Sequence, residues 1–319
     1  MSKIVKNPVT SKRTFHSPLR YPGGKRRLVP YLAATLVAND LRPDLFVEPF
    51  AGGASVALEL LATDRVERIA LADADPLIAA LWKTVFTGPD RDFAWLCRQV
   101  EQIDLDLAMW DRMKYTRWRA DRTRALAGLY LNRTSFNGSL YRGTGPIGGR
   151  EQAGNYAVGA RFPRSKLVNR LRACRELSHR VHFVREDDAM RVVTSARVEA
   201  KVLGWEPFFY LDPPFWAKAK WLYSRWFTDL EHEELAEQLR FLREPYLLSY
   251  DVAEPIAKLY MRHDHVQVAD VELFYAGVAR GAGHEYVITN LERLPTETRL
   301  FRTNAERHQR RESSVRSGG

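Results

Sequence analysis

Residues 46–55 read FVEPFAGGAS, an apolar run that leads into a glycine turn and then into a helical pattern. Glycine has no side chain, so a ligand can approach the backbone of such a turn, and the next helix offers unpaired N–H groups at its N-terminus. In open α/β sheets, ligands bind at the carboxyl ends of strands. The turn lacks the GxGxxG spacing that is typical of NAD sites. The segment therefore predicts a strand, a ligand-binding turn and a helix, with a ligand other than NAD.

Strand and helix patterns alternate along much of the remaining chain. Apolar runs bounded by turn residues predict strands, and the runs are residues 45–48, 68–72 and 208–211, with further candidates at 182–184 and 246–249. Helical patterns occupy residues 27–36, 54–61, 77–85 and 228–242. The last of these begins with a capping box of Thr228 and Glu231. Such alternation predicts an α/β fold, with a mostly parallel sheet and helices on both faces.

Residues 91–180 interrupt this alternation. Helical patterns at 95–100 and 107–131 precede a glycine-rich stretch at 137–159. From Asp90 to Arg180 there are 18 Lys/Arg and 9 Asp/Glu, so this part carries +9 of the chain's net charge of +10. Interleaved cations and aromatic residues suit a phosphate backbone and exposed bases, although a solvated basic helical face has the same composition.

We therefore expect a mainly helical nucleic-acid-binding insert within an α/β domain. The expected divisions are a disordered leader at 1–14, a catalytic domain at 15–90 and 181–300, the insert at 91–180, and a basic disordered tail at 301–319.

Composition excludes several classes of protein. The apolar runs are too short to span a membrane, and the N-terminus lacks the apolar region of a secretory signal. Only Cys97 and Cys174 occur, and neither has metal-ligand spacing. We expect a cytoplasmic protein without disulfides, without a membrane segment and without a required metal.

An acidic residue ends the second predicted strand. Asp73 lies at the end of residues 69–73, about 20 residues after the glycine turn, where a carboxylate can accept hydrogen bonds from ribose hydroxyls. Asp75 is the alternative, although its place before Pro76 also suits a helix cap. We favour Asp73 for the ribose.

The stretch Asp212-Pro213-Pro214-Phe215 follows another apolar strand and indicates the chemistry. Prolines at a strand end prevent further pairing and stiffen the turn, which fixes the Asp212 carboxylate and the Pro213 carbonyl as two acceptors. An exocyclic amine has two N–H donors, and accepting both favours a tetrahedral nitrogen whose lone pair can attack a methyl sulfonium. Phe215 offers a stacking face for a flipped base. The work is orientation and electrostatics more than proton abstraction.

Residues 18–25, PLRYPGGK, form a further glycine turn. An aromatic residue precedes the glycines and Lys25 follows them, so the turn can close over an anionic or aromatic ligand.

These four segments, in this order, resemble the Dam-like DNA adenine methylases over roughly residues 15–292. The resemblance implies a Rossmann-like methyltransferase core, S-adenosylmethionine as cofactor and double-stranded DNA as partner. Asp212-Pro213-Pro214-Phe215 resembles the catalytic tetrapeptide, with Phe215 where the family usually has Tyr. The cofactor-binding residues that it implies are Tyr21, Gly24, Lys25, Phe50, Ala51, Gly52, Gly53, Asp73 and Asp212.

Other segments match the family more loosely. Residues 183–188 lie where it has an acid beside the cofactor adenine, and we choose Asp187, with Asp188 or simple helix capping as alternatives. Residues 132–138, NRTSFNG, resemble the start of its DNA-inserting hairpin, residues 274–281 resemble a late glycine-rich loop near DNA, and residues 284–290 resemble its last strand. The implied DNA contacts are Arg133, Phe136, Asn137, Arg142 and Arg280.

The sequence thus predicts methyl transfer to the N6 amine of adenine in DNA by base flipping. Cytosine N4 methylation is disfavoured because such enzymes usually carry Ser at the Asp212 position. An RNA substrate and a non-catalytic DNA-binding scaffold remain as alternatives, while the acidic residues cluster poorly for a metal-dependent nuclease. One core with one insert is compatible with a monomer. The recognised site, and whether the enzyme is solitary or belongs to a restriction or phage system, stay open.

Overall fold

The structure is a computed structural model that describes residues 15–20, 25–216, 226–263, 265–276 and 280–300, without the side chains of 274–282. The predicted disordered leader and tail lie outside these ranges. Within them, no helix combines the length and the apolar character that crossing a membrane requires.

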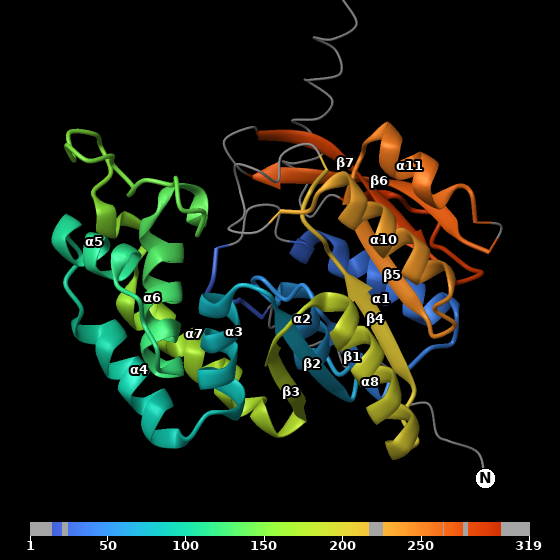
Figure 1. The fold of residues 1–319 in the computed structure, drawn as a ribbon, viewed down its shortest axis with the longest axis horizontal. Helices are drawn as coiled ribbons and strands as arrows, with labels where there is room; N and C mark the ends of the chain where they lie inside the picture. Colours follow the sequence, from blue (N-terminus) through green and yellow to red (C-terminus); the bar gives the residue numbers. More distant parts are fainter. Residues whose placement is uncertain (1–14, 21–24, 217–225, 264, 277–279, 301–319) are drawn as a thin grey trace, which may run out of the picture.

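One sheet runs through the described part of the chain (Figure 1). Its strand order is β3-β2-β1-β4-β5-β7-β6-β8. Strands β1 to β5 are parallel, and β7 lies antiparallel between β5 and β6. The strands are β1 (Leu45–Glu48), β2 (Arg68–Asp73), β3 (Val181–Glu186), β4 (Pro207–Leu211), β5 (Tyr246–Asp251), β6 (Gln267–Ala276), β7 (Arg280–Thr289) and β8 (Arg299–Leu300). The predicted α/β fold with a mostly parallel sheet is confirmed.

Helices cover both faces of the sheet because alternate strand side chains point to opposite faces. In β1, Phe46 belongs to one hydrophobic core, whereas Leu45 and Val47 belong to the other. The first core includes side chains of α1 (Val29–Ala38), α2 (Ser55–Ala62) and α3 (Pro76–Trp82), and the second includes those of α8 (Ala189–Leu203), α10 (Asp229–Arg240) and α11 (Glu254–Tyr260). A buried four-residue strand such as β1 needs apolar residues on both faces, as its sequence shows.

Most of the predicted elements form. The capping box is present, since Thr228 Oγ1 accepts from Glu231 N and the Glu231 side chain accepts from Thr228 N. The expectation of one helical stretch over 107–131 is wrong, because α5 ends at Tyr115 and α6 begins at Asp121. The break contains Trp118, whose indole N–H donates to the Met113 carbonyl.

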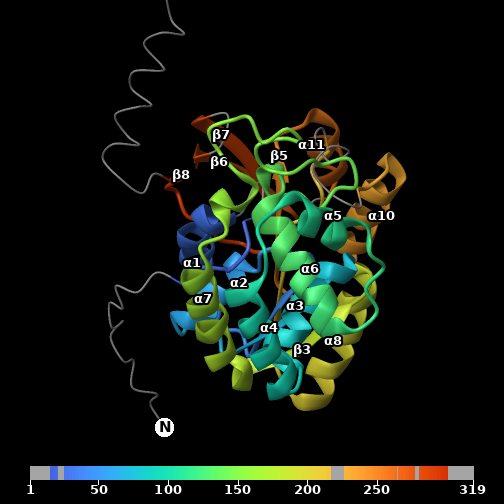
Figure 2. The same ribbon diagram turned by 90° about the vertical axis from the view of Figure 1, so that its left-hand side faces the viewer.

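Four α-helices separate α3 from β3, where a single helix would suffice for the sheet connection. They are α4 (Asp90–Gln102), α5 (Leu107–Tyr115), α6 (Asp121–Thr134) and α7 (Arg164–Glu176). Figures 1 and 2 show them as a bundle beside the β3 edge of the sheet. A π-helical segment, Lys83–Thr87, connects α3 to this bundle. The bundle's apolar side chains, such as Leu129 and Trp110, belong to the same core as α2 and α3.

Helix α6 packs closely on α3 at Gly128. A Cβ atom placed at Gly128 would lie 2.8 Å from the Leu77 carbonyl oxygen, so a side chain there has no room. The bundle is therefore fitted against the helix that follows β2.

We predict that Gly128→Ala destabilises the protein by about 1–3 kcal/mol, because overpacking outweighs the better helix propensity of alanine. Urea denaturation measures the change. Gly145→Ala is the matched control, since no heavy atom lies within 4 Å of its Cβ position. Equal stability of the two variants would show that α3 and α6 are not tightly packed.

Candidate active site

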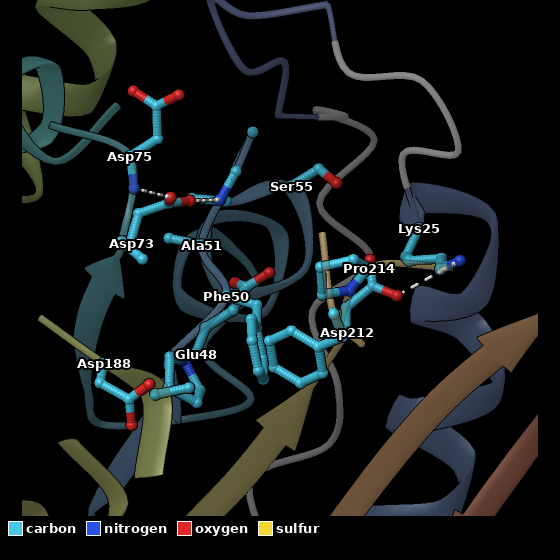
Figure 3. Close-up of a pocket in the computed structure, with 17 residues that line it drawn as sticks. Lys25, Glu48, Phe50, Ala51, Ser55, Asp73, Asp75, Asp188, Asp212 and Pro214 are labelled. Atoms are coloured by element: carbon cyan, nitrogen blue, oxygen red, sulfur yellow. Dashed lines mark hydrogen bonds and ion pairs between the residues drawn. The ribbon is translucent and has the colours of Figure 1, made fainter. Parts of the chain in front are cut away.

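A pocket of about 840 Å³ of empty space, partly open to solvent, lies at the carboxyl ends of β1, β2 and β4 (Figure 3). The strand order reverses between β1 and β4, and such a switch point is where open α/β sheets bind ligands. The described residues lining it are Lys25, Glu48, Pro49, Phe50, Ala51, Gly52, Gly53, Ala54, Ser55, Asp73, Ala74, Asp75, Asp188, Ala189, Asp212, Pro214 and Phe227.

The glycine turn after β1 is held by its neighbours. Gly52 and Ala54 have φ angles of 44° and 47°. Glycine adopts this region freely, whereas alanine is strained there by about 1–2 kcal/mol. The Trp82 indole donates to the Gly52 carbonyl at 2.9 Å, and Glu48 Oε2 accepts from Ala57 N at 3.0 Å. Strained, well-supported backbone is typical of ligand sites. All four predicted loop residues, Phe50 to Gly53, line the pocket.

Asp73 lies beside this turn and supports it. Its Oδ2 accepts from Gly52 N and its Oδ1 accepts from Asp75 N, both at 2.8 Å. Burial raises the pKa of Asp73 to about 7, and the Asp75 carboxylate adds to the increase. Asp75 caps α3 by accepting from Leu77 N at 2.9 Å. Both acids line the pocket, and the role of Asp73 toward a ribose stays a prediction.

The structure favours Asp188 over our choice, Asp187, beside the pocket. Asp188 lines the pocket and caps α8 by accepting from Met190 N at 3.0 Å. Asp187 is not among the lining residues, accepts from Asp188 N and lies 3.7 Å from Arg191 Nη1. The pocket lining thus favours Asp188, the stated alternative, and which of the two acids contacts a cofactor stays a prediction.

The stretch Asp212-Pro213-Pro214-Phe215 follows β4 directly. Asp212 and Pro214 line the pocket, Pro213 is buried, and Phe215 is partly buried with Lys25 Nζ 4.7 Å from its ring centroid. The structure thus brings the predicted catalytic acid and the predicted cofactor loop to the same cavity.

Lys25 faces Asp212 at one end of the pocket (Figure 3). It begins the 3₁₀ segment Lys25–Leu28, and its Nζ lies 3.3 Å from Asp212 Oδ1 and donates to Glu285 Oε1 at 2.7 Å. Burial raises the pKa of Asp212 to about 6, Lys25 opposes this increase, and Glu285 adds to it. Burial also raises the pKa of Glu48 well above its usual range. Lys25 was predicted to contact a cofactor; it lines the pocket, but its ammonium pairs with these carboxylates.

Four of the five predicted DNA contacts, all but Arg280, lie on α6 or in the loop that follows it, and none is a pocket-lining residue. Phe136 is 58% exposed, Arg142 is exposed, and Asn137 adopts a φ of 54° in the 3₁₀ turn Phe136–Gly138. The Asn132 side chain fixes this turn, since its Nδ2 donates to the carbonyls of Arg20 and Gly138.

Arg133 does not fit the predicted role of a DNA contact. It is only 7% exposed, and its Nε donates to the Arg161 carbonyl at 2.7 Å. The guanidinium is thus turned inward and supports the backbone near Arg161. Burial lowers its pKa to about 9, with Arg20, Arg170 and Arg161 adding to the decrease.

Three predicted site residues are not placed in detail. Tyr21 and Gly24 lie outside the described residues. Arg280 is the first residue of β7, but its side chain is outside the described part.

Three residues at the site were not anticipated. Phe227 lines the pocket, with its ring centroid 5.8 Å from that of Phe50. Ser249 Oγ donates to Asp212 Oδ1 at 2.8 Å, and Glu285 pairs with Lys25. The available signal was polarity, because Ser249 and Glu285 each stand directly beside apolar or aromatic strand residues. Phe227 carries no such signal.

Within the described ranges, no group of three His, Cys, Asp or Glu side chains is arranged to hold a metal ion.

One comparison with known proteins identifies the family of the chain. No curated protein matches the chain. Among solved structures, the chain is similar to a precorrin-6y C5,15-methyltransferase from Geobacter metallireducens GS-15, at 13% identity, with 81% of this chain and 84% of that chain covered and a TM-score of 0.34. A family model described as D12 class N6 adenine-specific DNA methyltransferase matches residues 21–275, which include the pocket, the helical bundle and Asp212-Pro213-Pro214-Phe215. The chain therefore belongs to the D12 class of N6 adenine-specific DNA methyltransferases.

Proposed function

We propose that this methyltransferase binds S-adenosylmethionine in the pocket between β1, β2 and β4, and methylates an adenine that it flips out of double-stranded DNA. The observation that carries the proposal is that Asp212 and Pro214 line the same cavity as the Phe50–Gly53 turn and Asp73. The proposed acceptor of the amine, Asp212, and a cradle for a nucleoside cofactor thus share one site.

The charge of the pocket fits the cofactor. Five acidic side chains line it, against one basic side chain among the described lining residues, Lys25. They belong to Glu48, Asp73, Asp75, Asp188 and Asp212. S-adenosylmethionine carries a sulfonium, so an acidic site attracts it. When bound, it supplies an electrophilic methyl group. Asp73 accepts hydrogen bonds from the ribose, the Gly52–Gly53 backbone allows close approach, and Phe50 with Phe227 offers aromatic faces.

Asp212 and Pro213 orient the amine. The Asp212 carboxylate and the Pro213 carbonyl accept the two N6 hydrogens, which aims the nitrogen lone pair at the methyl carbon. Bound S-adenosylmethionine would supply the methyl group to this lone pair, and the amine would release one of its two protons to the solvent. Phe215 stacks on the base, and its ring is already held beside Lys25.

Base flipping follows from where the acceptors lie. An N6 amine inside a duplex cannot reach a carboxylate in a pocket at strand ends, so the base has to leave the stack. Unstacking costs a few kcal/mol, which contacts between the bundle and the DNA backbone offset. Phe136, Asn137 and Arg142 project from the bundle as the candidates to enter the duplex or read a base.

The enzyme is further proposed to act as a monomer in the cytoplasm. A single chain contains both the pocket proposed for methyl transfer and the helical bundle proposed to bind DNA. Cys97 and Cys174 are free and buried in the hydrophobic core, as suits a reducing compartment.

The direct test incubates the protein with unmethylated genomic DNA and tritiated S-adenosylmethionine, and identifies the labelled nucleoside by chromatography. Label in N6-methyladenine supports the proposal, and sequencing the product then gives the recognised site. Label in N4-methylcytosine, label only with RNA, or no label despite cofactor binding would each overturn it.

We predict that Asp212→Asn slows methyl transfer by about 100-fold or more, because an amide offers one acceptor and adds a donor. In the wild type the rate should rise with pH through about 6, the pKa of Asp212, since the ionised carboxylate accepts a hydrogen bond from the amine more strongly than the protonated acid does. Single-turnover rates from about pH 5 to 9 measure both effects. Asp270→Asn, an exposed carboxylate on β6, is the matched control and should keep the wild-type rate.

We predict that the preference for S-adenosylmethionine over S-adenosylhomocysteine increases with pH. The product lacks the sulfonium charge, while Asp73 and Asp212 ionise near pH 7 and 6. The ratio of the two Kd values, from calorimetry, should therefore grow about 3-fold or more between about pH 5.5 and 8. Asp73→Asn should reduce this growth, and Asp270→Asn should leave it unchanged. A ratio independent of pH in the wild type would contradict the acidic-pocket account.

We predict that Phe136→Ala weakens binding to duplex DNA about 5-fold or more, because an exposed ring is lost from the proposed DNA face. S-adenosylmethionine binding should not change, since Phe136 is not a pocket residue. Phe241→Ala, with a ring 65% exposed at the end of α10, is the matched control. Fluorescence anisotropy with labelled duplex gives the affinity, and equal affinities of the two variants would remove Phe136 from the DNA face.

A further inference from the structure

Two polar side chains lie in the interior of the sheet beyond the pocket. Ser249, on β5, is 0% exposed, and Glu285, on β7, is 1% exposed. A buried carboxylate is costly unless a counter-charge and hydrogen bonds satisfy it. Packing alone would be served better by apolar residues at both positions, so their polarity requires another explanation.

Both side chains connect to Asp212. Glu285 Oε1 accepts from Lys25 Nζ at 2.7 Å, and the same Nζ lies 3.3 Å from Asp212 Oδ1. Ser249 Oγ donates to Asp212 Oδ1 at 2.8 Å and lies 3.0 Å from Tyr210 Oη. Because the Ser249 hydroxyl gives its proton to Asp212, Tyr210 is the donor in the remaining bond. The chain of contacts thus runs from β7 through Lys25 and Asp212 to β5 and β4.

The contacts on Asp212 are one-sided. Both neighbours approach Oδ1, and no described residue forms a hydrogen bond with Oδ2. Two donors on one oxygen fix the rotation of the carboxylate and keep the other oxygen available to a substrate. Lys25 is 3% exposed, so its charge acts in a medium that screens little.

We propose that Ser249 and Glu285 are positioning residues that set the orientation and charge of the catalytic Asp212, Ser249 directly and Glu285 through the ammonium of Lys25. The proposal rests on the proposed role of Asp212 as acceptor of the N6 amine. It assigns the strand β7 a part in catalysis, where its sequence suggested a structural element only.

The two residues act on Asp212 in opposite directions. The Ser249 hydrogen bond lowers the pKa of Asp212, whereas the negative charge of Glu285 raises it. The other ionisable groups coupled to Asp212 are Glu48, Tyr210 and Tyr250, and burial raises the pKa of each well above its usual range. The variants below leave Glu48, Tyr210 and Tyr250 in place, so a change in the pKa of Asp212 reports on Ser249 and Glu285.

The experiment follows the ¹³C carboxyl signals of aspartate-labelled protein against pH, with Asp212 assigned by its absence in Asp212→Asn. Glu285→Gln keeps the acceptor for Lys25 but removes the charge, so the pKa of Asp212 should fall by about 0.5–1 pH unit. Ser249→Ala removes a hydrogen-bond donor to Asp212, so the pKa of Asp212 should rise by a similar amount. Glu254→Gln, an exposed carboxylate on α11, is the matched control and should change nothing.

Single-turnover methylation of DNA by the same proteins supplies the second measurement. The acid limb of the pH–rate profile should shift to lower pH in Glu285→Gln and to higher pH in Ser249→Ala. At about pH 8 both variants should lose rate about 3-fold or more, with little change in KM for S-adenosylmethionine. A lack of change, or shifts in the same direction, would overturn the proposal. If one variant does not fold, the other still decides. If the pKa of Asp212 shifts in opposite directions in the two variants but the wild type does not methylate DNA, the proposed function is contradicted. The effect of Ser249 and Glu285 on Asp212 would still be supported.

Discussion

Lys25 can be buried in this protein because carboxylates face its ammonium from two sides. A lysine taken out of water without a counter-charge would lose its proton or open the structure. The pairing with Asp212 and Glu285 therefore ties together three distant parts of the chain, namely the segment before α1, the end of β4 and the strand β7. It also explains why Asp212 retains a negative charge near neutral pH, although burial opposes that charge.

Local patterns predicted the parts of the site that lie within one turn of the chain. The strand-turn-helix unit at residues 45–61, Asp73 at the end of β2 and the rigid Asp212-Pro213-Pro214-Phe215 stretch are recognisable because apolar runs end at glycine, acid or proline there. Their meeting at one edge follows from parallel strand order, which the alternation of elements also predicts. The structure agrees with this part of the prediction.

Contacts between distant residues were not predictable in the same way. Lys25 and Glu285 are 260 positions apart, and no periodicity in either segment indicates that they meet. Arg133 shows a related difficulty, because an arginine in a basic, aromatic stretch suggests an exposed side chain, yet this side chain turns inward to a carbonyl. The choice between Asp187 and Asp188 depended on the angle at which the chain enters α8, which sequence does not specify.

Helix α3 contacts both the glycine turn after β1 and the helical bundle. Its Trp82 donates to the Gly52 carbonyl in the turn beside the pocket, and its Leu77 carbonyl fits against Gly128 of the helical bundle. The bundle therefore cannot be exchanged independently of α3. Grafting it onto another methyltransferase would need a matching α3, because otherwise the contact between α3 and α6 would be lost next to the glycine turn after β1. Changes of DNA specificity in such a scaffold are accordingly expected to come from the loop that follows α6 rather than from exchange of the whole bundle.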